Sequence, residues 1–172
     1  MRFTNRIILS LWLIGSACCT TALAEPVLEL RQDPEAVLED QRLTGNARAQ
    51  ARRRGAIRSV PQLFVYHPDR SPAFHLQGYR ENFQRHLDLM IEAFRVERSM
   101  VDLETLLGRA RNDDGGRLTV DDLPPRSITI VVYRRDDCEQ CEKLEVALDE
   151  WLRDRRRQHP DFDPVRIRVT VP

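Results

Sequence analysis

The feature that most limits the possible folds of this chain is a pair of cysteines between an apolar segment and a helical one. The pair is Cys138 and Cys141, separated by Glu-Gln, and residues 128–133 before it are almost all β-branched or aromatic. Such a run is typical of a central parallel strand covered on both faces. After Cys141, leucines recur at helical spacing until Pro160. The sequence therefore predicts a strand that leads through the cysteine pair into a helix.

The segments around this unit predict a mixed α/β fold. At the C-terminus, residues 165–171 alternate between apolar and polar side chains, which indicates a half-buried strand that completes a strand–helix–strand unit. Upstream, residues 62–66 and 73–77 are apolar β-formers separated by a proline-rich turn, so they predict an antiparallel hairpin that begins after Pro61. A helix over 81–94 is expected to follow the hairpin.

The N-terminus has the features of a secretion signal. Arg2 and Arg6 precede the apolar run 7–17, and Ala22-Leu23-Ala24 fits the small-x-small cleavage pattern. The run is shorter than the roughly 18 residues that a membrane span requires. We therefore expect cleavage after Ala24, a periplasmic mature protein and no stable membrane span.

The charge and the cysteine content limit the classes of function that this chain can have. Removal of residues 1–24 takes two of the 27 basic residues and none of the 27 acidic ones, so the mature net charge is −2. Proteins that bind nucleic acid normally carry an excess of basic residues, and the mature chain has no such excess. Of the four cysteines, Cys18 and Cys19 leave with the signal. In an oxidising compartment the remaining pair predicts a disulfide, either structural or catalytic.

The position of the pair suits redox chemistry. At a helix N-terminus, free N–H groups and the helix dipole stabilise a thiolate on Cys138, and Cys141 can then resolve a mixed disulfide. Acidic neighbours oppose this effect (Asp136, Asp137, Glu139 and Glu142). Zinc and an inert disulfide are the rival interpretations. The histidines form no recognisable second half of a zinc site, and so short a disulfide loop adds little stability.

Two segments together resemble the thioredoxin family. Residues 128–152 look like its strand, CxxC motif and helix, and residues 54–66 look like its G-I-R-x-[IV]-P-x-L segment. The resemblance implies that Pro61 is a cis-proline beside the disulfide. Because the proline segment comes first here, we expect a circularly permuted order. Helix–Pro–hairpin–helix would occupy residues 25–98, an accessory helix and exposed linker 99–127, and strand–CxxC–helix–strand 128–172.

The resemblance implies a thioredoxin-like mixed sheet flanked by helices and a thiol–disulfide oxidoreductase. Cys138 would be the attacking thiol, Cys141 the resolving thiol and Pro61 the active-site wall, with no cofactor and no metal. Its partners would be protein thiols or disulfides of the cell envelope. The alternative is a non-catalytic, thioredoxin-like component of an envelope assembly, such as a secretion or conjugation apparatus, in which the disulfide is structural.

Overall fold

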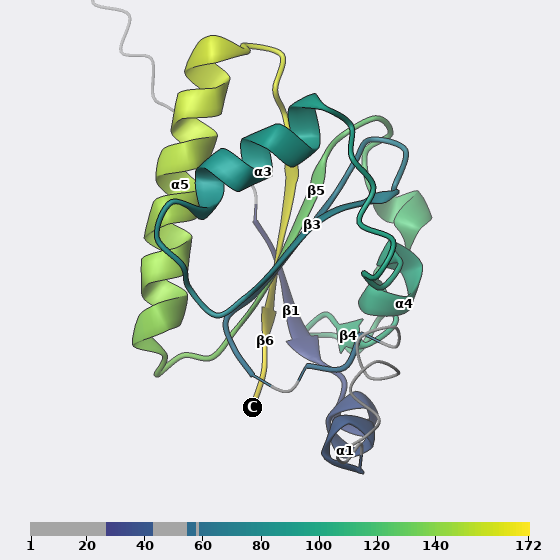
Figure 1. Cartoon of the computed structure of the whole chain (residues 1–172). Helices are drawn as coiled ribbons and strands as arrows, with labels where there is room; N and C mark the ends of the chain where they lie inside the picture. Colours follow the sequence, from purple (N-terminus) through teal and green to yellow (C-terminus); the bar gives the residue numbers. More distant parts are fainter. Residues whose placement is uncertain (1–26, 43–54, 58) are drawn as a thin grey trace, which may run out of the picture.

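The apolar run that precedes the cysteines forms the strand on which the sheet is built. The computed structural model describes residues 27–42, 55–57 and 59–172 (Figure 1). The predicted signal sequence therefore lies outside the described residues. Within them the strands are β1 (Val27–Gln32), β2 (Gln62–Tyr66), β3 (Pro72–Gln77), β4 (Ala110–Arg111), β5 (Thr129–Arg134) and β6 (Val165–Thr170). They form one six-stranded sheet in the order β3-β2-β5-β6-β1-β4.

The sheet is mixed, and its direction changes at β5. On one side β5 pairs antiparallel with β2, with Gln62 opposite Tyr133 and Tyr66 opposite Thr129. On the other side β5 runs parallel to β6, and β6 runs parallel to β1. A parallel pair needs a crossover connection, and α5 (Glu139–Gln158) supplies it between β5 and β6. The predicted hairpin, the helix after the cysteines and the last strand are confirmed.

Helices cover both faces of the sheet. α5 and α3 (Phe83–Glu92) lie on the same face (Figure 1), where the indole N–H of Trp151 donates to Asp88 at 2.7 Å. The opposite face is covered by α4 (Leu103–Leu107) and by the segment around the short helix η2 (Val120–Asp122). α1 (Pro34–Arg42) follows β1. Among the helices that the structure describes, none has the length and apolar character needed to cross a membrane.

The first strand of the described chain, β1, was not predicted from the sequence, and its position bears on how the domain is divided into halves. β1 lies beside β6, so the start of the described chain belongs to the same parallel unit as its end. The elements from β2 to α4 are therefore inserted between β1 and β5 in the sequence. The hairpin β2–β3, within residues 25–98, and the strands β5 and β6, within 128–172, form adjacent blocks of the sheet, whereas β1 pairs with β6 on the far side of the second block.

The stretch 109–126 is exposed over most of its length, as predicted for a linker, but three of its residues are buried in the fold. Arg109 and Ala110 are buried, and Ala110 pairs with Gln32 in the antiparallel contact between β4 and β1. Leu123 is buried in the core on the α4 face. These residues close the sheet beyond β1 and cover part of its face, so the segment is an integral part of the fold.

Truncation of a core residue of α5 should destabilise the protein, whereas truncation of its outer face should not. Leu148 has no exposed surface, while Val146, two residues earlier, is 59% exposed. We expect Leu148→Ala to lower the free energy of unfolding by about 2–5 kcal/mol, because it leaves a cavity. Val146→Ala, the matched control, should change it by less than about 0.5 kcal/mol. Urea denaturation measures both, and equal effects would contradict this placement of α5.

Candidate redox site

The two cysteines lie where β5 passes into α5. Cys138 is the N-cap residue of α5, and Cys141 lies in the first turn of the helix. Their Sγ atoms are 2.16 Å apart, at the distance of a disulfide bond, with the Cα atoms 5.2 Å apart. The sequence placed the pair between a strand and a helix, and the structure brings the two sulfurs into contact at that junction.

The two sulfurs differ in their access to solvent. Cys138 is partly exposed, whereas Cys141 has no exposed surface and belongs to the buried side of α5. A thiol–disulfide exchange passes through attack on one particular sulfur, so access selects which sulfur reacts. The burial pattern makes Cys138 the sulfur that an outside reagent can reach, while Cys141 is shielded from solvent.

The helix N-terminus supplies a hydrogen bond to the outer sulfur. The backbone N–H of Cys141 donates to Cys138 Sγ at 3.2 Å. The positive end of the α5 dipole lies at the same position. In the reduced protein, these two groups would favour negative charge on Cys138, which is the form of cysteine that attacks a disulfide.

The acidic neighbours of the pair are partly neutralised by ion pairs. Glu139 lies 2.6 Å from Lys143, and the hydrogen bond from that lysine lowers the pKa of the Glu139 carboxyl. Asp137 lies 2.7 Å from Arg135, whose hydrogen bond lowers the pKa of the Asp137 carboxyl. All four side chains are more than half exposed, so solvent also screens their charges. The acidic residues therefore oppose a thiolate less than the sequence alone indicates.

Pro61 lies at the edge of the sheet where the cysteine pair is also found. It directly precedes β2, whose first residue Gln62 pairs with Tyr133 near the end of β5. The Val60–Pro61 peptide bond is cis, and the Pro61 carbonyl accepts the Gly78 N–H at 2.8 Å. A Cβ atom built on Gly78 would lie 3.9 Å from Gln140 Oε1. Gly78, which is bonded to Pro61, therefore lies near Gln140 in the first turn of α5, between the two cysteines.

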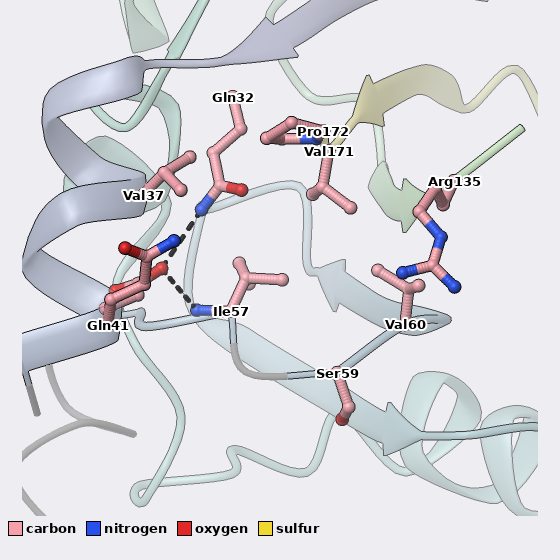
Figure 2. A pocket seen from close by; sticks show the side chains of 10 residues that line it. Gln32, Val37, Gln41, Ile57, Ser59, Val60, Arg135, Val171 and Pro172 are labelled. Carbon is pink, nitrogen blue, oxygen red and sulfur yellow. Dashed lines mark hydrogen bonds between the residues drawn. The ribbon is translucent and has the colours of Figure 1, made fainter. Parts of the chain in front are cut away.

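Next to this edge the structure has a hollow that the sequence did not predict (Figure 2). Its wall includes Val60, which precedes Pro61, and Arg135, which follows β5. Among its lining residues, the Asp40 carboxylate accepts the Ile57 N–H at 2.9 Å and the Gln32 side-chain amide at 3.0 Å.

Asp40 also pairs with a buried arginine. The Arg109 guanidinium donates to Asp40 and, at 2.9 Å, to Glu39. Burial raises the pKa of the Asp40 carboxyl, while the Ile57 N–H and Arg109 oppose that rise. No local motif marks these residues, since Asp40 and Arg109 are 69 positions apart.

In the described part of the chain, no group of three or more His, Cys, Asp or Glu side chains is arranged to hold a metal ion. A zinc site needs four ligands in tetrahedral geometry. The sulfurs of Cys138 and Cys141 are bonded to each other, so the dithiol and its disulfide are the chemistry that this site offers.

The difference in burial predicts a difference in reactivity between single-cysteine variants. In Cys141→Ser, the remaining Cys138 thiol should be alkylated by iodoacetamide at pH 7. In Cys138→Ser, the remaining Cys141 thiol should react at least about tenfold more slowly, because it has no exposed surface. Mass spectrometry of timed samples measures both rates. Equal rates, or faster labelling of Cys141, would contradict the assignment of Cys138 as the outer sulfur.

Comparison with known proteins adds no assignment to this geometry. The chain matches no protein-family model, no curated protein and no solved structure. The function is therefore inferred from the site itself, which has an accessible sulfur at a helix N-terminus, a buried partner and the proline segment at the same edge of the sheet.

Proposed function

We propose that this chain is a periplasmic, thioredoxin-like thiol–disulfide protein that exchanges disulfides with proteins of the cell envelope. The observation that carries the proposal is the disulfide between partly exposed Cys138 and buried Cys141 at the first turn of α5. A purely structural disulfide needs no accessible sulfur, and this one closes too short a loop to add much stability. The predicted secretion signal over residues 1–24 supports export to an oxidising compartment.

The exchange conserves atoms and electrons in two steps. The Cys138 thiolate attacks one sulfur of a client disulfide, forms a mixed disulfide and releases the other client sulfur as a thiolate. Cys141 then loses its proton and attacks Cys138 Sγ, which forms the Cys138–Cys141 disulfide and releases the second client thiol. Two electrons pass from the cysteine pair to the client. The reverse sequence of steps oxidises a client dithiol.

The arrangement of the sheet supports the thioredoxin-like part of the proposal. The strand before the CxxC motif pairs antiparallel with the strand after Pro61, so the two segments of the resemblance are neighbours although their order in the sequence is reversed. We propose that these two segments are the halves of a thioredoxin-like fold in circularly permuted order, with β1 added to the sheet beside β6. Pro61 would then form one wall of the redox site, next to Gly78 and Gln140.

Insulin reduction tests the redox proposal. With dithiothreitol as the electron source, the purified protein should accelerate insulin reduction, and Cys138→Ser should return the rate to the uncatalysed background because the attacking sulfur is gone. Cys141→Ser, reduced beforehand and then mixed with insulin after dithiothreitol is removed, should instead accumulate a mixed disulfide with the insulin chain, since the resolving thiol is missing. Non-reducing gels detect that species.

A different set of results would favour a non-catalytic envelope component. In that case the wild-type protein neither reduces insulin nor oxidises a reduced test protein, and Cys141→Ser traps no mixed disulfide. Those results together would reject the proposed exchange.

A further inference from the structure

Two glutamine side chains hold the segment that leads into Pro61. Gln62 is the first residue of β2, and Gln77, the last residue of β3, lies directly opposite it in the hairpin. The side-chain amide of Gln62 donates to the Ser59 carbonyl at 2.9 Å, and that of Gln77 donates to Ser59 Oγ at 2.8 Å. We call Gln62, Gln77 and Ser59 the glutamine clamp. It fixes Ser59, which precedes β2 and lies outside the strand.

The orientation of the Gln62 amide is set from both of its ends. Its Nε2 group donates to Ser59, and its Oε1 atom faces His75, whose Nε2 lies 3.1 Å away. An amide oxygen can only accept, so the proton between the two groups belongs to His75 Nε2. The His75 ring is stacked on Phe64, with the ring centroids 4.4 Å apart. A chain of hydrogen bonds therefore runs from β3 through the start of β2 to the Ser59 carbonyl.

The two glutamines differ in burial. Gln62 is 4% exposed and pairs on its other side with Tyr133 of β5, whereas Gln77 is exposed. A hydrogen bond in a buried setting is costly to lose, because water does not replace the missing partner. An exposed amide can exchange its partner for water at little cost. Gln62 is therefore the stronger member of the clamp.

The clamp lies next to the backbone that borders the redox site. Pro61 follows Ser59 by two residues, and its carbonyl accepts the N–H of Gly78, which directly follows Gln77. A Cβ atom built on Gly78 would lie 3.9 Å from Gln140 Oε1. The residues on either side of the hairpin end are thus joined to each other at the point where they approach the first turn of α5.

We propose that the glutamine clamp positions the Val60–Pro61 segment for disulfide exchange, with Gln62 as its main positioning residue. This inference rests on the proposed function, in which Pro61 forms one wall of the redox site. Supporting residues that hold such a wall by hydrogen bonds keep the reacting groups in a productive geometry, and small displacements slow a reaction. Without the Gln62 amide, the segment before Pro61 loses its buried anchor. Exchange then slows, although both cysteines keep their places on α5.

Replacement of Gln62 tests this role. Gln62→Leu keeps the approximate size of the side chain and removes both of its hydrogen bonds. Gln84→Leu is the matched control, because the Gln84 amide donates to the Ala147 carbonyl at 3.4 Å, between α3 and α5. With insulin as substrate, Gln62→Leu should lower kcat/KM about five- to tenfold, the rate equivalent of one hydrogen bond, and Gln84→Leu should stay within about twofold of wild type. The reduction potential of the cysteine pair should be unchanged in both variants.

The outcomes separate a positioning role from a structural one. If Gln62→Leu lowers the free energy of unfolding but reduces insulin at the wild-type rate, Gln62 is only structural and the inference fails, although the exchange itself stands. An equal loss of rate in Gln84→Leu, or a changed reduction potential in Gln62→Leu, would also overturn it, because the effect would then extend beyond the Pro61 segment. If the wild-type protein does not reduce insulin, both proposals are rejected.

Two exposed positions keep the test decisive should Gln62→Leu fail to fold. Gln77→Leu and Ser59→Ala remove the same hydrogen bond from its two ends. Each should slow insulin reduction by about two- to threefold, and the double variant should be no slower than either single one, since both act through one interaction. Wild-type rates in both single variants, or effects that add in the double variant, would contradict the proposed clamp.

Discussion

The antiparallel pairing of β2 with β5 is the contact on which the rest of the structure depends. It joins segments more than 60 residues apart, with Gln62 opposite Tyr133 and Tyr66 opposite Thr129. Because the strands run in opposite directions, the start of β2 meets the end of β5, so Pro61 and the cysteine loop lie at one edge of the sheet. A shift of one residue would turn the apolar side chains of β2 to the wrong faces. Burial on both faces therefore fixes the register and, with it, the site.

The position of α5 over the sheet is held by charge as well as by apolar packing. Leu144 and Leu148 contact the core, while Glu145, one helical turn after Cys141, faces β6. Glu145 accepts two hydrogen bonds from Arg168, at 2.9 and 2.6 Å. Such bidentate pairs fix orientation as well as distance. The helix that carries both cysteines is thus anchored close to the disulfide, and its N-terminus is held against the end of β5.

The elements around the cysteines were predictable from sequence because their signals are local. The apolar run of β5, the hairpin after Pro61 and the helix after Cys141 each show their own periodicity within a few residues. The ion pair of Glu139 with Lys143 is similarly local, since residues four apart meet on a helix. The sequence did not reveal that ion pairs partly neutralise the acidic side chains around the cysteines.

The parts that sequence reasoning missed depend on distant partners. β1 carries Glu29 and Arg31 between its inward residues, and only its pairing with β6 makes it part of the sheet. β4 has two residues, too few for any periodic pattern. Arg109 is the type of residue expected at the surface, and its burial depends on carboxylates about 70 positions away. The hollow in Figure 2 combines residues from four separate segments, so no single motif could mark it.

The equilibrium reduction potential of the Cys138–Cys141 disulfide tests the central claim most directly. The protein would be equilibrated in buffers of defined thiol and disulfide composition, and the reduced fraction measured by alkylation and mass spectrometry. An accessible Cys138 at a helix N-terminus, with its acidic neighbours largely paired, predicts a potential of about −270 to −180 mV, the range of dithiol enzymes that exchange with protein substrates. A potential below about −300 mV is typical of a structural disulfide, and that result would contradict the account.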